Sequence, residues 1–218
     1  MSATWEVIEG DCLEVMRGLP DGSVDCCITS PPYNHLGPKY SRGGGMHAGK
    51  KCVNQWLSNS DAVMYQDEQS ESEYTEWIAQ VLMEMMRVTK GLVWVNHKTR
   101  YRDGEGIHPL SFLSARLYAE VVWDKGGSMA LNCRRFAPSH EYLYAFGKPI
   151  FWDDSMNGLC SVWRIGQVTG SEHPCPFPEE LVRRPIRASC PPGGLVLDPF
   201  CGSGTTGAVA LQEGRRFC

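Results

Sequence analysis

The chain has 218 residues and a formal net charge of −4, and its hydrophobic fraction of 42% and charged fraction of 21% exclude an intrinsically disordered protein. This length predicts one domain, residues 1–218, that buries a core without disulfide or metal staples. No apolar run approaches the ~20 residues that a membrane span needs, and Met1–Val7 lacks the basic start and apolar core of a secretory signal. We therefore expect a cytoplasmic protein with no membrane partner.

Short β-rich runs alternate with helical stretches, which favours an α/β fold with a mostly parallel sheet. The expected strands are Trp5–Ile8, Val24–Thr29, Gly91–Val95, Ala119–Trp123, Glu141–Phe146 and Gly194–Leu197. The expected helices are Tyr74–Val88, Pro109–Leu117, Pro178–Ser189 and Thr205–Glu213. Ten cysteines are scattered among these elements without C-x-x-C spacing, so we expect reduced thiols and no bound metal.

One segment does not follow this alternation. Asn34–Ser60 contains three consecutive glycines and four basic residues but no acid, and Asp61–Glu76 then carries six acids and no base. A long basic loop inside a domain is usually functional or disordered.

The first stretch that suggests chemistry is the end of the second expected strand. The apolar run Val24–Thr29 leads into Ser30, Pro31, Pro32 and Tyr33. Proline fixes φ and cannot continue a sheet ladder, so the backbone here is stiff. A hydroxyl and a flat ring thus follow the carboxyl end of a strand, which is where ligands bind in open α/β sheets.

The second stretch follows the last expected strand. Leu195–Leu197 leads into Asp198, a turn with Gly202 and Gly204, and then a helix. Glycine lets the backbone approach a ligand closely, so this strand, turn and helix form a candidate cofactor loop.

Together these two stretches resemble the S-adenosylmethionine-dependent amino-methyltransferases of DNA. Ser30-Pro31-Pro32-Tyr33 is similar to the catalytic tetrad of that family, and Asp198–Thr205 is similar to its cofactor loop. The catalytic motif precedes the cofactor motif, which is typical of the permuted β class (N4-cytosine and N6-adenine types). The resemblance implies a Rossmann-like methyltransferase sheet that is circularly permuted and shortened at its C-terminal end.

The resemblance also implies the roles of individual residues. The expected catalytic residues are Ser30, Pro31, Pro32 and Tyr33, and the expected cofactor-binding residues are Asp11, Cys12, Phe177, Asp198, Pro199, Phe200, Cys201, Gly202, Ser203, Gly204 and Thr205. Asp11 would accept a hydrogen bond from the adenine amino group, and Asp198 would face the methionine end of the cofactor. An ordinary turn aspartate and a core phenylalanine stay as alternative interpretations of Asp11 and Phe177.

The expected reaction moves a methyl group from the sulfonium of S-adenosylmethionine to an exocyclic amino nitrogen. Serine at position 30 is more typical of N4-cytosine enzymes, so we expect a cytosine-N4 methyltransferase, with N6-adenine as the alternative. A non-catalytic relic that binds DNA or cofactor stays open, as does an RNA or protein amide substrate. A nucleotide-dependent dehydrogenase that uses the glycine turn would leave the Ser30–Tyr33 stretch unexplained.

The expected partner is double-stranded DNA, and a homodimer and a cognate restriction endonuclease are left open. The protein is expected to be bacterial or phage-encoded. Residues 34–73 are expected to form a mobile insertion that faces the DNA, and residues 126–171 a short target-recognition segment. The residues expected to contact DNA are Lys39, Arg42, Lys50, Lys51, Arg134 and Arg135. Arg183, Arg184 and Arg187 are expected to form a solvated helix face instead.

Residues Arg215–Cys218 stand where the next strand begins in the family, followed there by an acidic residue that binds the cofactor ribose. We therefore expect reduced cofactor affinity for this chain. Calorimetric titration with S-adenosylmethionine tests this expectation, and a micromolar or tighter dissociation constant would contradict it.

Overall fold

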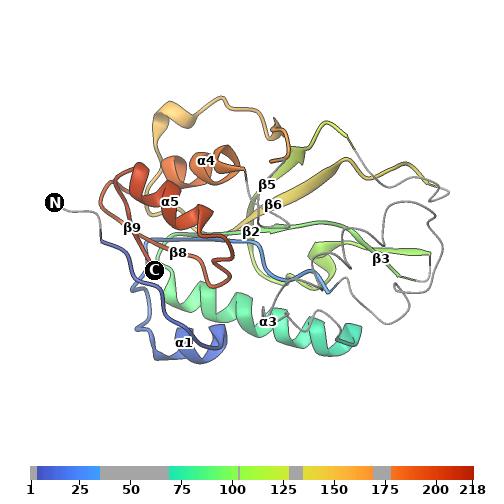
Figure 1. Ribbon diagram of the computed structural model, residues 1–218, viewed down its shortest axis with the longest axis horizontal. Helices are drawn as coiled ribbons and strands as arrows, with labels where there is room; N and C mark the ends of the chain where they lie inside the picture. Colours follow the sequence, from blue (N-terminus) through green and yellow to red (C-terminus); the bar gives the residue numbers. More distant parts are fainter. Residues whose placement is uncertain (1–3, 35–68, 103, 128–134, 169–177) are drawn as a thin grey trace, which may run out of the picture.

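The computed structural model describes residues 4–34, 69–102, 104–127, 135–168 and 178–218. A mixed sheet of seven strands lies at the centre, in the order β7-β5-β6-β2-β1-β8-β9. Helices α1 and α3 lie on one face of this sheet, and α4 and α5 lie on the other (Figure 1). The expected α/β fold is confirmed.

The strands of the sheet are β1 (Cys26–Thr29), β2 (Leu92–His97), β5 (Leu117–Asp124), β6 (His140–Gly147), β7 (Val162–Arg164), β8 (Leu195–Leu197) and β9 (Arg216–Phe217). Strand β1 is parallel to β2 and β8, β8 is parallel to β9, and β7 is parallel to β5. Strand β6 is antiparallel to both of its neighbours. Strands β3 (Arg100–Arg102) and β4 (Glu105–Ile107) form a separate hairpin.

The helices are α1 (Cys12–Gly18), α3 (Glu71–Val88), α4 (Glu179–Ser189) and α5 (Thr205–Gln212), with short 3-10 turns at Pro109–Ser111 and Asp154–Met156. Helix α3 begins at a capping box in which Ser70 and Glu73 bond to each other's backbone. None of the described helices is both long and apolar enough to cross a membrane.

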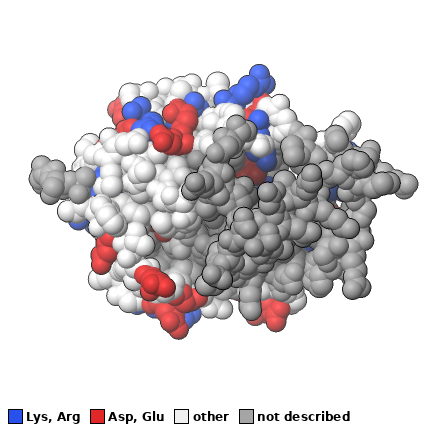
Figure 2. All heavy atoms as spheres, viewed as in Figure 1, with Lys and Arg blue, Asp and Glu red and all other residues white. Residues whose placement is uncertain are grey.

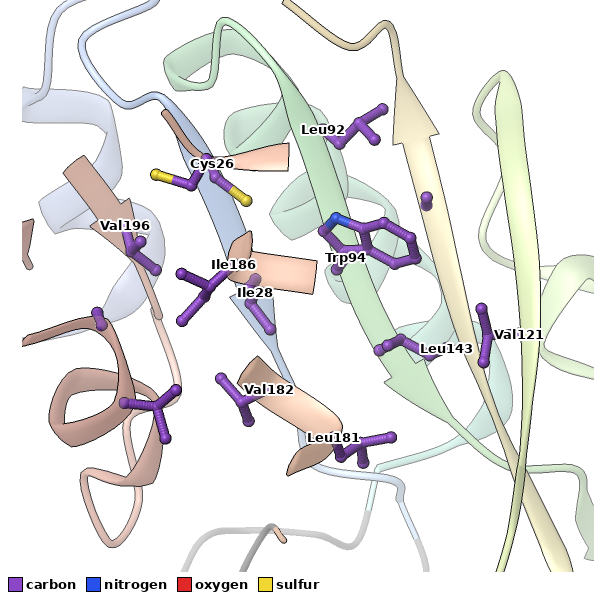
Figure 3. Close-up of a cluster of buried hydrophobic side chains, with 14 of the residues drawn as sticks. Cys26, Ile28, Leu92, Trp94, Val121, Leu143, Leu181, Val182, Ile186 and Val196 are labelled. Carbon is purple, nitrogen blue, oxygen red and sulfur yellow. The ribbon is translucent and has the colours of Figure 1, made fainter. Parts of the chain in front are cut away.

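The strands β1 and β2 carry apolar side chains on both faces, because helices cover both. Cys26 and Ile28 of β1 pack with Trp94 of β2 and with Val182 and Ile186 of α4 in one core cluster (Figure 3). The alternate residues of these strands pack against α1 and α3 in a second cluster. Continuous burial along both strands therefore fixes them as central strands.

Two expected elements are wrong or reduced. Pro109–Leu117 is not a helix: a 3-10 turn ends at Ser111, and Leu117 already begins β5. The backbone carbonyl of Arg116 accepts a hydrogen bond from Gly147, so pairing with β6 replaces helical bonding here. Of Trp5–Ile8, the structure keeps one parallel bridge, between Trp5 and Phe217 of β9.

Candidate active site

Three parallel strands end at the same edge of the sheet. Strand β1 ends at Thr29, β2 at His97 and β8 at Leu197, and β1 lies between the other two. Because parallel strands share a carboxyl edge, the Ser30–Tyr33 stretch and the loop that begins at Asp198 emerge side by side. The two stretches are 165 or more residues apart in the sequence, and the fold brings them together.

A cluster of hydroxyl groups lies at the end of β1. The Ser30 Oγ and Tyr33 Oη atoms are 2.9 Å apart. The Tyr33 hydroxyl donates to Asn96 Oδ1 at 2.6 Å, and Ser30 Oγ lies 3.4 Å from the same oxygen. Asn96 Nδ2 donates to the Tyr142 carbonyl at 2.8 Å, which fixes the orientation of the amide. Asn96 Oδ1 therefore acts as a hydrogen-bond acceptor, and the lone pairs of Ser30 Oγ remain available to a donor.

The Tyr33 phenol is also in contact with a buried ion pair. Tyr33 Oη lies 3.3 Å from Glu141 Oε2, and Lys125 Nζ lies 2.9 Å from Glu141 Oε1. Burial, together with the negative charge of Glu141, raises the pKa of Tyr33 well above its usual value. The phenol therefore keeps its proton at neutral pH and acts as a hydrogen-bond donor.

A second chain of hydrogen bonds holds the proline segment. Tyr74 Oη donates to the Pro32 carbonyl at 2.7 Å and lies 2.9 Å from His97 Nε2. Because the Tyr74 proton goes to Pro32, the Tyr74 oxygen is left to accept from His97 Nε2, and His97 Nδ1 lies 2.9 Å from both the amide nitrogen and the carbonyl oxygen of Lys98. Burial lowers the pKa of His97 to about 3, so the ring stays neutral.

The residue after Tyr33 is held by side-chain hydrogen bonds. Asn34 is buried at a φ of 54°, and its side chain bonds to both backbone groups of Gln69. The Glu71 carboxylate accepts two hydrogen bonds from the Arg100 guanidinium and forms an ion pair with Arg102. Asn34 Nδ2 also donates to Glu71, and Arg102 donates to the Asn34 carbonyl at 3.1 Å, so the end of the Ser30–Tyr33 stretch is connected to the start of α3 and to the β3–β4 hairpin.

The loop after β8 is organised around Asp198. The buried carboxylate accepts hydrogen bonds from Thr29, from Thr206 and from the Phe200 amide. Burial raises the pKa of Asp198, and these three donors oppose that rise. The Phe200 ring packs edge-on against Trp77 of α3, with ring centroids 5.7 Å apart. Contact of Asp198 with the methionine end of a cofactor stays a prediction.

The glycines of this loop have left-handed backbones. Gly202 has a φ of 53° and Gly204, the N-cap of α5, a φ of 78°. A Cβ atom at Gly204 would meet no atom of the described residues within 4 Å. The side chains of Ser203 and Thr205 bond to each other at 3.0 Å, and no side chain of the described residues caps the helix. The loop therefore offers an open turn at a helix N-terminus. Pro199 and the half-buried Cys201 complete the loop.

The structure describes some of the other expected site residues, while others lie outside the described residues. Asp11 caps α1, since its Oδ1 accepts from the Leu13 and Glu14 amides. Burial raises the pKa of the neighbouring Cys12 to about 11, which keeps its thiol protonated. Adenine binding by this pair stays a prediction. The positions outside the described residues are Phe177, Lys39, Arg42, Lys50, Lys51 and Arg134.

Basic side chains in the described part of the chain are mostly paired. Arg183, Arg184 and Arg187 of α4 contact Glu179, Glu180 and Glu213. Arg135 is exposed, and its guanidinium lies 3.7 Å from the centroid of the Tyr101 ring. Figure 2 shows described basic and acidic side chains next to one another along the upper edge of this view. The interpretation of the α4 arginines as a solvated face fits these ion pairs.

Sequence reasoning missed four polar residues of the site: Asn96, His97, Lys125 and Glu141. The prediction ended the second central strand at Val95, one residue before Asn96. Polar residues directly after a buried apolar run were the available signal for Asn96 and His97. Glu141 lies near the start of β6, and it reaches this edge because β6 is antiparallel to β2.

The family model described as "DNA methylase", for the N6/N4 type of methyltransferase, matches residues 24–157 and 152–218. The chain belongs to the DNA methylase family. The recognition made from the two motifs, a DNA amino-methyltransferase of the S-adenosylmethionine-dependent type, is thereby confirmed.

Curated relatives of this DNA methylase match over nearly its whole length. It is 27% identical to the type II methyltransferase M.XycI of Xanthomonas campestris pv. cyanopsidis, over 97% of this chain and 81% of the relative. It is 28% identical to the type II methyltransferase M.Cfr9I of Citrobacter freundii, over the same shares.

Solved structures share the fold. The cytosine-N4-specific PvuII DNA methyltransferase matches with a TM-score of 0.72 and 18% identity, over 100% of this chain and 81% of that one. The putative DNA modification methylase TTHA0409 of Thermus thermophilus, solved with S-adenosyl-L-methionine, matches with a TM-score of 0.61 and 22% identity, over 99% and 87%.

Proposed function

We propose that this DNA methylase transfers a methyl group from S-adenosylmethionine to the exocyclic N4 of cytosine in double-stranded DNA. The observation that carries the proposal is the meeting of the Ser30–Tyr33 stretch and the Asp198–Thr205 loop at one sheet edge, joined by the 2.6 Å bond between Thr29 and Asp198. Serine at position 30 favours cytosine, as does the likeness to a structure named as cytosine-N4-specific. N6-adenine is the alternative, since the family includes both types.

The loop after β8 fits the cofactor. When bound, S-adenosylmethionine supplies a methyl group on a positively charged sulfur. The open turn at Gly202 and Gly204 lets the backbone approach a ligand closely, because neither residue has a Cβ. The buried carboxylate of Asp198 places negative charge behind this loop. In the proposal Asp11, Cys12 and Phe177 complete the cofactor site.

The catalytic stretch fits an amine substrate. The N4 lone pair of cytosine is delocalised into the ring, so acceptors at its two N–H groups favour the pyramidal nitrogen that attacks. Ser30 Oγ is one acceptor, because its own proton is directed to Tyr33 or Asn96. The Pro32 carbonyl already accepts from Tyr74, so we assign the Pro31 carbonyl as the second acceptor.

The Tyr33 ring is assigned to the substrate base. An enzyme that modifies a base takes that base out of the duplex and holds it by stacking. The phenol anchors the ring through Asn96 and Glu141, which fixes the position of the ring. Alignment of nitrogen and methyl carbon at about 3–3.5 Å then supplies much of the rate.

Mass spectrometry of nucleosides tests the proposal. The chain is expressed in cells that lack cytosine-N4 and adenine-N6 methylation, and their DNA is digested to nucleosides. N4-methylcytosine is expected, N6-methyladenine would favour the alternative, and unmodified DNA from well-expressed protein would favour a non-catalytic relic. The names of the curated relatives, type II methyltransferases, support a restriction-modification setting with a cognate endonuclease.

Two variants connect the product to the site. Ser30→Ala and Tyr33→Ala are expected to abolish methylation, because each removes a proposed contact to the base. Ser23→Ala is the matched control, since the Ser23 hydroxyl is buried without a hydrogen-bond partner among the described residues and precedes β1 instead of following it. Methylation by Ser30→Ala at the rate of Ser23→Ala would contradict the assignment.

A further inference from the structure

Three side chains at the active-site edge form one buried hydrogen-bonded unit. Thr29 Oγ1 donates to Asp198 Oδ1 at 2.6 Å, and Thr206 Oγ1 donates to Asp198 Oδ2 at 2.6 Å. The Phe200 amide donates to Asp198 Oδ1 at 3.0 Å. Thr29, Asp198 and Thr206 are all buried, so water does not compete for these bonds.

This unit lies where backbone pairing ends. Strands β1 and β8 are paired at Cys26 with Val196 and at Cys27 with Leu197. Two residues after Cys27, the Thr29 side chain bonds to the residue directly after Leu197. A side-chain bond thus continues the connection between the two strands into the region where the loops begin.

Each threonine lies next in the chain to one of the two stretches that the proposed reaction uses. Thr29 directly precedes Ser30, so a change in its backbone angles moves the amine acceptor. Thr206 lies in the first turn of α5, directly after the glycine turn. The carboxylate between them bonds both hydroxyls and the Phe200 amide of the cofactor loop.

Burial of a carboxylate is costly, and three well-placed donors offset that cost without making it a strong source of stability. A pair of apolar residues would pack at this position with less penalty. The three polar side chains are therefore better explained as fixing the relative position of the two stretches, because charge-assisted hydrogen bonds are short and directional.

We propose that Asp198 is a positioning residue that sets the separation between the amine-binding stretch and the cofactor loop, with Thr29 fixing the first and Thr206 the second. This inference rests on the proposed methyl transfer. A misplacement of about 1 Å costs roughly 100-fold in rate in a reaction that depends on alignment.

Threonine-to-valine substitutions test the inference, because valine keeps the shape and removes the hydroxyl. Thr29→Val is expected to lower kcat by about 10- to 100-fold on unmethylated genomic DNA, within the range that misalignment produces. Its dissociation constant for S-adenosylmethionine, measured by calorimetry, should rise by a smaller factor. Thr206→Val should raise the dissociation constant for S-adenosylmethionine by the larger factor and lower kcat by the smaller one. Thr29→Ser and Thr206→Ser keep the hydroxyl and should restore most of each loss.

Thr89→Val is the matched control. The Thr89 hydroxyl is buried, has no hydrogen-bond partner in the described part of the chain, and follows α3 before β2 begins. This variant should keep the wild-type kcat and cofactor affinity. If Thr29→Val does not fold, Asp198→Asn keeps the side-chain shape and one acceptor oxygen, and it should lower kcat with retained secondary structure.

Hydrogen exchange separates failure of this inference from failure of the proposed function, because it needs no turnover. Thr29→Val should speed amide exchange in the peptide 198–206, although Thr29 belongs to another strand. Wild-type exchange in this peptide, or equal impairment of Thr29→Val and Thr29→Ser, would overturn the inference even in an active enzyme. An inactive wild-type chain whose exchange responds as described would contradict only the methyl transfer.

Discussion

At the scale of single residues, Asn96 determines which hydrogen bonds Ser30, the proposed amine acceptor, can accept. Its oxygen accepts from the Tyr33 hydroxyl and lies within bonding distance of Ser30, while its nitrogen is held by the Tyr142 carbonyl. An acceptor at this position directs hydroxyl protons away from the substrate side, which leaves serine lone pairs for an amine.

Asn96→Leu should therefore lower kcat by roughly 100- to 1,000-fold, the range seen when one oriented polar group of an active site is removed. It should also lower the free energy of unfolding by about 1–3 kcal/mol, because buried hydroxyls lose their acceptor. Steady-state kinetics and urea unfolding measure the two effects. Asn96→Asp keeps the acceptor and should retain more activity; a Leu variant as active as the Asp variant would contradict this role.

At the scale of elements, α5 packs unusually close to β9. Gly202, Gly204 and Gly207 have the spacing G-x-G-x-x-G, in which the third glycine permits close contact between helix and strand. A Cβ at Gly207 would lie 2.8 Å from Phe217 Cδ1. The position of the loop after β8 therefore depends on a residue without a side chain inside α5.

Gly207→Ala should lower the free energy of unfolding by about 1–3 kcal/mol, because overpacking exceeds the gain in helix propensity. Gly18→Ala is the control, since a Cβ at the end of α1 would meet nothing within 4 Å in the part of the chain that the structure describes. Urea unfolding should show Gly18→Ala at or above the wild-type stability. Equal stability of the two variants would contradict the close packing of α5 on Phe217.

The basic residues that follow the Ser30–Tyr33 stretch in the sequence also have a testable role. Lys39, Arg42, Lys50 and Lys51 are proposed to bind phosphates, and removal of each phosphate-binding side chain should reduce the salt dependence of DNA affinity by about one unit of log K per log salt. Substitution of all four by glutamine should lower both the affinity and this slope. Arg184→Gln, whose parent side chain pairs with Glu180 of the same helix, should change neither. Fluorescence anisotropy at several salt concentrations makes the comparison.

At the scale of the whole molecule, the buried neutral His97 couples folding to pH. The unfolded chain binds a proton on this ring near the ordinary pKa of 6.5, whereas the folded chain resists it down to about pH 3. Between these values the unfolded state binds more protons, so the free energy of unfolding rises with pH. The contribution is complete above pH 6.5 and is lost as the pH falls toward 3.

Wild type should therefore lose more stability between pH 7 and pH 5 than His97→Gln does, by up to about 1.4 kcal/mol per pH unit. Urea unfolding at several pH values measures the two slopes, and their difference removes the contribution of carboxylates common to both chains. Identical slopes would contradict the burial of a neutral ring at this position.

Much of the fold followed from local patterns. The central strands at Cys27 and Val93 and the long helix around Val81 were predictable, because continuous or periodic apolar residues need a specific burial geometry. The region at Pro109–Leu117 was not, because its backbone bonds to β6, and a helix and a strand edge are equally compatible with so short an apolar run.

The sequence by itself determined the family and the two motifs, because Ser30–Tyr33 and Asp198–Thr205 are contiguous and their chemistry is local. Only the tertiary structure decided that Asn96 and Glu141 reach the same Tyr33 hydroxyl and that Thr29 shares a carboxylate with Thr206. The physical reason is that hydrogen bonds between distant strands depend on strand order and register, which no local pattern encodes.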